Sequence, residues 1–171
     1  MLLPNSLKPL TRAEYMMSNT VKPTLSLAVQ YVSAAQPLPT RAQFRRWAQA
    51  SLQHPLSLTL RIVDEDEGRS LNRDYRGKDY ATNVLTFVYD DVATLSPDAV
   101  RYGDVVICAP VVEKEAAEQH KDLVAHYAHL TLHAMLHLQG YDHENDEDAA
   151  RMEALETQLM LKLHFLDPYI A

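Results

Sequence analysis

Hydrophobic and polar residues alternate along several short stretches of the chain. Residues 25–31 and 56–62 each place an apolar side chain at every second position, which is the period of a β-strand with one buried face. Residues 83–89 are rich in β-branched and aromatic side chains and predict a third strand. The continuous apolar run 105–108 is typical of a strand that is buried on both faces.

Apolar residues at helical spacing lie between and after these strands. Thr40 and Gln43 form a capping-box pattern at the start of one helix, and Pro110 suits the first turn of another. The predicted helices cover residues 41–53, 64–75, 111–119, 122–138 and a last segment that Asn145 caps. We therefore predict an α/β (α+β) fold, a single domain with a mixed, roughly four-stranded sheet, about five helices and helix 122–138 at its centre. The order of the strands does not follow from this pattern.

The same pattern indicates the domain boundaries. Residues 1–23 show no clear period and are expected to be a flexible N-terminal arm, whereas residues 24–171 are expected to form the domain. No apolar run reaches the ~18 residues that a membrane span needs, and residues 1–20 lack the apolar stretch of a signal peptide. We therefore expect a cytoplasmic protein without a membrane partner. Cys108 is the only cysteine, which excludes a disulfide framework and a cysteine-based zinc site.

The most specific chemical pattern is the motif HAMLHLQGYDH at residues 133–143. On a helix, His133 and His137 lie on one face with their Cβ atoms about 5–6 Å apart. Gly140 can end that helix in the left-handed conformation, so that the chain turns back and presents His143. Three histidines with an open position are the ligand set of a catalytic zinc ion, whereas structural zinc sites have four protein ligands. We predict one Zn²⁺ per chain at this motif.

Zinc proteases share this spacing in the signature H-E-x-x-H-x-x-G-x-x-H. Their general base is the glutamate that follows the first histidine, and the chain has Ala134 at that position. A zinc metallopeptidase-like hydrolase is therefore an alternative that lacks the group needed to take a proton from water.

Other polar residues near the motif have less specific interpretations. His126 and His129 extend the histidine stripe on the predicted helix. His129 would be either a group that supports the ligands or transfers protons, one turn before them, or a residue explained by packing or a backbone hydrogen bond, and we favour the latter. Asp104 and Asp142 are candidate neighbours of the metal, but aspartates in turns more often satisfy the backbone.

A basic cluster precedes the third predicted strand and contains Arg69, Arg73, Arg76 and Lys78. Such a run is usually a solvated helix face. An arginine beside the flexible Gly77 can nevertheless bind a phosphate through two parallel hydrogen bonds.

Three segments together resemble the YbeY family of rRNA-maturation endoribonucleases: residues 71–79 with 82–87, residues 103–108, and the histidine motif itself. The resemblance extends over residues 24–171 and includes the ends 152–156 and 167–170. The chain departs from the family pattern at Ala134, where glycine is usual, and at Val88, where proline is usual. Ala134 adds one methyl group and should leave the ligands in place, whereas Val88 removes a fixed kink from residues 86–90.

The resemblance implies a zinc-dependent endoribonuclease that prefers single-stranded RNA. It implies action on ribosomal RNA, notably in maturation of the 3′ end of 16S rRNA, and in ribosome quality control. The implied partners are the ribosomal small subunit or its assembly factors. The implied metal ligands are His133, His137 and His143, and the implied catalytic residues are Arg76 and His133.

Several points of mechanism stay open at the level of sequence. Arg76 would stabilise the negative charge of the pentavalent phosphate. The general base would be His129, Asp142 or a zinc-bound hydroxide, and the nucleophile would be water or the ribose 2′-OH. A non-catalytic, zinc-stabilised ribosome-assembly factor is a further alternative. The net charge of −7 suggests that a partner supplies the RNA, since phosphate attraction requires basic clusters.

Overall fold

Three parallel strands and one antiparallel strand form the sheet at the centre of the computed structural model, which describes residues 22–170. The strands are β1 (Leu25–Tyr31), β2 (Leu56–Val63), β3 (Val84–Val88) and β4 (Arg101–Cys108). Their order across the sheet is β1-β2-β4-β3. The antiparallel strand β3 therefore lies at one edge, next to β4.

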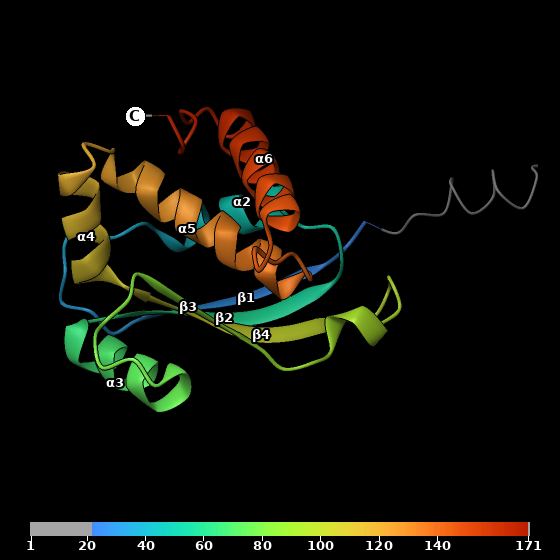
Figure 1. Cartoon of the computed structure of the whole chain (residues 1–171), viewed down its shortest axis with the longest axis horizontal. Coiled ribbons are helices and arrows are strands. Elements are labelled where there is room, and N and C mark those ends of the chain that lie inside the picture. Colours follow the sequence, from blue (N-terminus) through green and yellow to red (C-terminus); the bar gives the residue numbers. More distant parts are fainter. Residues whose placement is uncertain (1–21, 171) are drawn as a thin grey trace, which may run out of the picture.

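Helices cover the two faces of the sheet unequally (Figure 1). One face carries α5 (Leu123–Leu138), with α2 (Arg41–Ala50), α4 (Ala109–Glu118) and α6 (Asp146–Lys162) around it. The opposite face carries α3 (Glu65–Arg76), and a short 3-10 turn, Val92–Thr94, lies between β3 and β4. None of the helices in residues 22–170 is both long enough and apolar enough to span a membrane.

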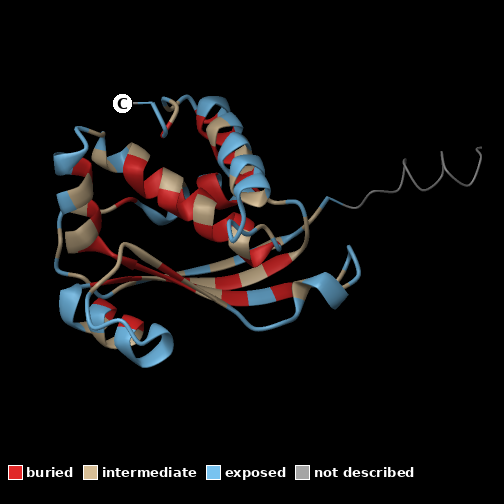
Figure 2. Ribbon diagram, viewed as in Figure 1, coloured by how far each residue is buried: buried red, intermediate tan, exposed pale blue. Residues whose placement is uncertain are grey.

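Helix α5 is the centre of the core because most of its surface is apolar. Tyr127, Leu132 and Leu136 are among its fully buried side chains, and the helix is enclosed by the sheet and by its neighbouring helices (Figure 2). Each fully buried side chain of this size contributes about 1.5–3 kcal/mol of transfer free energy. The helix that carries the histidine motif is therefore held rigidly from several sides, and its predicted central position is confirmed.

The predicted fold class is confirmed, with a four-stranded mixed sheet and five α-helices among the described residues. Most boundaries lie within two residues of the prediction, and two differ by more. Helix α2 ends at Ala50 because the backbone N–H and the hydroxyl of Ser51 both donate to the carbonyl of Ala48, which tightens the last turn. Strand β4 begins at Arg101 because its polar first half pairs with the start of β2. The predicted N-terminal arm lies outside the described residues, apart from residues 22 and 23.

The two departures from the family pattern are accommodated without a break in either element. Val88 pairs with Gly103 as the last residue of β3, and the N–H of Tyr89 continues the ladder to the carbonyl of Tyr102. Ala134 is fully buried within α5, and that helix is continuous through it.

Candidate metal centre

The imidazoles of His133 and His137 project from α5 one helical turn apart and are both held at Nδ1. Nδ1 of His133 donates to Oε1 of Glu156 at 2.6 Å, and Nδ1 of His137 donates to the carbonyl oxygen of Tyr141 at 2.9 Å. Because an acceptor oxygen requires an N–H, the proton of each neutral ring is on Nδ1. The lone pair on Nε2 of each ring is therefore available to a metal.

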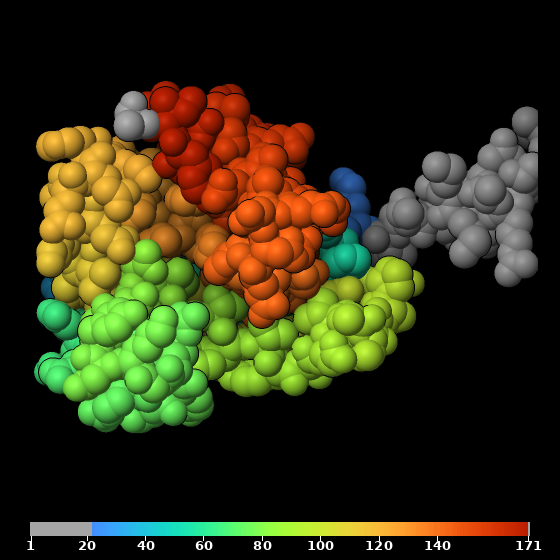
Figure 3. Space-filling model, viewed as in Figure 1, coloured from blue at the N-terminus to red at the C-terminus, as the bar shows by residue number. Residues whose placement is uncertain are grey.

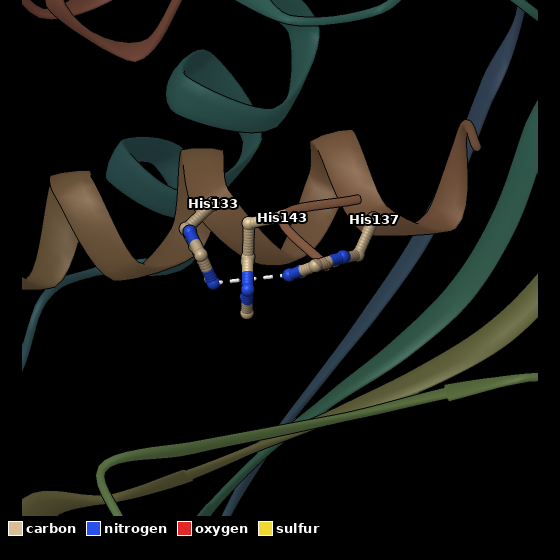
Figure 4. Close-up of side chains that lie close together, drawn as sticks. All are labelled: His133, His137 and His143. Carbon is tan, nitrogen blue, oxygen red and sulfur yellow. Dashed lines mark hydrogen bonds between the residues drawn. The ribbon is translucent and has the colours of Figure 1, made fainter. Parts of the chain in front are cut away.

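The two Nε2 atoms lie 3.1 Å apart (Figure 4). Two ligand nitrogens at 2.0–2.1 Å from a tetrahedral zinc ion lie about 3.3 Å from each other. The spacing of His133 and His137 therefore fits one shared zinc ion with little adjustment.

The third histidine reaches the same place because the chain turns back after α5. Gly140 has φ of 100°, a conformation that side-chain-bearing residues rarely adopt. His143 follows on an exposed loop, and one ligand atom from each of the three histidines lies within 4.8 Å of the others. Figure 4 shows the three rings converging on the side of α5 that faces the sheet.

The electrostatic environment keeps His137 in its metal-binding form. Burial, together with the neighbouring His133 and His143, lowers the pKa of His137 from 6.5 to about 4. The ring is therefore neutral at physiological pH, as a metal ligand must be.

Glu156, on α6, is a member of the site that the sequence interpretation missed. Its carboxylate is fully buried and accepts hydrogen bonds from His133, from Nε2 of His129 at 2.9 Å and from the hydroxyl of Tyr169. Burial alone would raise the pKa of Glu156, but these three donors outweigh it and lower the pKa to about 2. Glu156 is thus an anion that orients a candidate ligand, an arrangement common behind metal-bound histidines.

His126 is buried, as packing requires, but the hydrogen-bond partners of His129 and His126 are side chains and not the backbone. His129 donates to the side chain of Glu156 rather than to the backbone. His126 donates from Nε2 to Glu115 at 2.8 Å, and Asn83 also donates to that carboxylate. His129 binds the buried carboxylate of Glu156 and His126 the half-buried carboxylate of Glu115. Only His129 shares its carboxylate with a candidate ligand.

A cavity of about 640 Å³ opens beside the three histidines. Its walls are His133, His137, the loop from Gly140 to His143, Tyr75, Arg76 and the segment Thr82–Val88. The surface is recessed between α3 with its following segment, coloured green, and the loop after α5, coloured orange (Figure 3). The cavity therefore brings Arg76 to the same hollow as the histidines, although 57 residues separate Arg76 from His133.

Only one arginine of the basic cluster lines this cavity. Arg69 is paired with Asp79 through two hydrogen bonds of 2.9 Å, and Arg73 is paired with Asp74. Arg76 lies on the last turn of α3, which ends at Gly77 in the left-handed conformation. An arginine without an ion pair in residues 22–170 retains its fork of donors for a phosphate.

The two candidate aspartates differ in position. Asp142 lines the cavity. One of its carboxylate oxygens accepts a hydrogen bond from the backbone N–H of His143 at 2.7 Å, so its side chain satisfies a backbone donor of the loop, as expected for an aspartate in a turn. Asp104 lies on the other face of the sheet, where it accepts a hydrogen bond from the hydroxyl of Tyr89 and lines a different cavity.

Comparison with known proteins identifies the family. The family model of the endoribonuclease YbeY matches residues 29–164. An endoribonuclease YbeY from Nitrosospira multiformis is 56% identical over 155 residues, which cover 85% of this chain and 82% of that protein. One from Nitrosomonas europaea is 56% identical over 146 residues, 85% of each chain.

The fold comparison agrees at a greater sequence distance. A solution structure from Thermotoga maritima matches with a TM-score of 0.52 and 21% identity, and the match covers 86% of this chain and all of that one. This structural likeness shows the fold, whereas the family model and the two relatives above show family membership. The chain belongs to the endoribonuclease YbeY family.

Proposed function

We propose that the chain is a zinc-dependent endoribonuclease that cleaves single-stranded RNA. In this proposal residues 24–171 are the catalytic unit, the substrate is ribosomal RNA, and the roles are 16S rRNA 3′ end maturation and ribosome quality control in the cytoplasm. The ribosomal small subunit or one of its assembly factors presents the RNA. The observation that carries the proposal is the convergence of three histidines and Arg76 on one cavity.

His133, His137 and His143 would hold the metal. Their donor set suits zinc, since neutral imidazoles with Nε2 exposed and Nδ1 hydrogen-bonded are typical of its sites. His143 lies on an exposed loop, with one ring nitrogen within 4.8 Å of a ring nitrogen of His133 and of His137. When bound, Zn²⁺ supplies Lewis-acid chemistry, which lowers the pKa of water or polarises a phosphate oxygen.

Arg76 would act on the phosphate. Its guanidinium offers paired donors that match two phosphate oxygens, and negative charge accumulates on those oxygens as the phosphorane forms. Donors positioned before the reaction stabilise that charge without reorganisation. Arg76 is therefore assigned to charge stabilisation, with His133 as a ligand whose orientation is set by Glu156.

The buried position of Ala134 speaks against the peptidase alternative. Ala134 is fully buried within the hydrophobic core and does not line the cavity. The side chain that would supply the general base in a zinc protease is therefore a methyl group that points into the core.

Metal content and RNA cleavage, measured together, test the proposal. Wild type should contain one zinc per chain and cleave a single-stranded oligoribonucleotide, and His137→Ala should lose both. His54→Ala is the matched control and should retain both, because His54 lies outside the cavity and the one hydrogen bond of its ring within the described residues is with the carbonyl of Pro97. Zinc without cleavage would favour the assembly-factor alternative, whereas cleavage by zinc-free His137→Ala would refute the site.

A further inference from the structure

Tyr75 is an aromatic side chain that the fold leaves largely exposed at the rim of the candidate site. It lies on the last turn of α3, next to Arg76, and is 69% exposed. A large apolar ring at this exposure loses most of the hydrophobic stabilisation that burial would provide. Its hydroxyl forms no hydrogen bond with another described residue, so its position is not explained by a polar contact.

One contact nevertheless fixes the ring. Tyr75 packs edge-to-face against Phe87 of β3, with centroids 5.1 Å apart and an interplanar angle of 73°. Such pairs stabilise a fold beyond the area that they bury. The ring is thus supported from one side, while most of its surface faces solvent.

The Tyr75–Phe87 pair also stands at the junction of two cavities. Both residues line the cavity of the three histidines, and both line a second cavity of about 460 Å³ on the other face of the sheet. Tyr75 and Phe87 are the two residues that the linings of these cavities share. Arg76, the phosphate-binding candidate, is the next residue along α3.

We propose that Tyr75, supported by Phe87, is a stacking platform for one unpaired base next to the phosphate bound by Arg76. This inference rests on the proposed ribonuclease function and adds a substrate determinant to it. Proteins that bind single-stranded nucleic acid use exposed aromatic rings in this way, because every base has a flat apolar face. A base within a duplex is already stacked on both faces, so the platform selects unpaired RNA.

Substitution of the ring tests the inference. Tyr75→Ala should lower the affinity for a short single-stranded oligoribonucleotide by about 5- to 150-fold, with zinc content unchanged. Loss of the Phe87 contact should lower its unfolding midpoint slightly, and the variant should remain folded under the conditions of the binding assay. Tyr75→Phe retains the ring and should bind like wild type. Tyr102→Ala is the matched control, because Tyr102 is 51% exposed on the same sheet and lines neither cavity.

Abasic oligonucleotides separate stacking from a structural role. Removal of the one base that stacks on Tyr75 should weaken wild-type binding as much as Tyr75→Ala does. The same abasic oligonucleotide should bind Tyr75→Ala no more weakly than the intact one does, because both changes remove the same contact. If every abasic position weakens Tyr75→Ala and wild type by the same factor, the inference is overturned.

The salt dependence of binding distinguishes the base contact from the phosphate contact. Each phosphate contact on a single strand contributes a slope of about −0.7 in log affinity against log salt. Arg76→Ala should therefore make the slope shallower by about 0.7, and Tyr75→Ala should leave it unchanged. A changed slope in Tyr75→Ala would refute stacking, whereas wild-type protein that neither binds nor cleaves RNA would overturn the proposed function and the inference together.

Discussion

Oε1 of Glu156 accepts the Nδ1 proton of His133 at 2.6 Å, from a helix that begins 13 residues after His133 in the chain. This hydrogen bond determines which nitrogen of His133 carries the proton and therefore which nitrogen faces the cavity. The carboxylate also adds negative charge behind the ring, which makes the imidazole a stronger donor to a cation. Helix α6 thus takes part in the candidate metal centre although it supplies no ligand.

Zinc affinity should depend on this carboxylate. Glu156→Gln replaces one acceptor oxygen with an NH₂ group, which faces N–H or O–H donors from His129, His133 or Tyr169. We expect zinc to bind about 10- to 100-fold more weakly, as measured by competition with a chelating dye. Glu153→Gln, an exposed position on the same helix, should bind zinc like wild type, and an equal loss in both variants would contradict the role of Glu156.

The depressed pKa of Glu156 predicts the pH dependence of stability. A carboxyl group with a pKa of 4.5 when unfolded and about 2 when folded stabilises the fold fully above pH 4.5, and this contribution disappears as the pH falls toward 2. The shift corresponds to ~3 kcal/mol. The unfolding free energies of zinc-free wild type and zinc-free Glu156→Gln can be measured with urea between pH 6 and pH 3. The difference between the two proteins should become smaller as the pH falls. A constant difference would count against an ionised Glu156.

The C-terminal segment should contribute to the same network through Tyr169. The hydroxyl of Tyr169 donates to Glu156, and Lys121 holds the segment by donating to the carbonyl of Pro168 at 2.8 Å. Tyr169→Phe removes one hydrogen bond to a charged acceptor and should lower the unfolding free energy by about 1.5–3 kcal/mol. Chemical unfolding checks this value, and Tyr80→Phe, at an exposed tyrosine, should change it little.

Gly103 should tolerate no side chain because it lies close to both α5 and β3. A Cβ at this position would lie 2.3 Å from Cδ2 of Leu138 and 2.5 Å from the backbone oxygen of Phe87. Since a backbone oxygen cannot rotate away, Gly103→Ala should destabilise the protein by about 1–3 kcal/mol. At Gly68 an added Cβ would meet side-chain atoms, Sγ and Cβ of Cys108 at 3.1 and 3.3 Å and Cβ of Ala81 at 3.7 Å. Gly68→Ala also gains helix propensity, so in a thermal unfolding measurement it should destabilise the protein less than Gly103→Ala does.

Local patterns in the sequence predicted the parts of the fold that depend on neighbours in the chain. The alternation in 25–31 and 56–62 corresponds to β1 and β2, and Asn145 caps α6 through its side chain as expected. The order β1-β2-β4-β3 was not predictable, because strand pairing depends on contacts between distant segments. Alternation with a period of two residues indicates which face of a strand is buried, but not which other strand pairs with it.

In the candidate site, too, the sequence predicted contacts between nearby residues of the chain and missed a contact between distant ones. The spacing of His133, His137 and His143 predicted their convergence, because a helix and one glycine turn connect them. Glu156 was missed because its partner lies 23 residues away on another helix. A signal was nevertheless present, since Glu156 follows Met152 by one helical turn on the buried stripe of α6, and a charged residue on such a stripe requires a partner.

The three histidines differ in how firmly the fold holds them, and this difference bears on the exchange of a bound ion. His133 and His137 belong to α5, which is enclosed by the core, whereas His143 belongs to an exposed loop. Segments with few buried contacts open with a small free energy, while core helices open only when the whole domain unfolds. An ion held by this triad would therefore leave when the loop swings outward. Its residence time would be governed by that loop, and not by the stability of the domain.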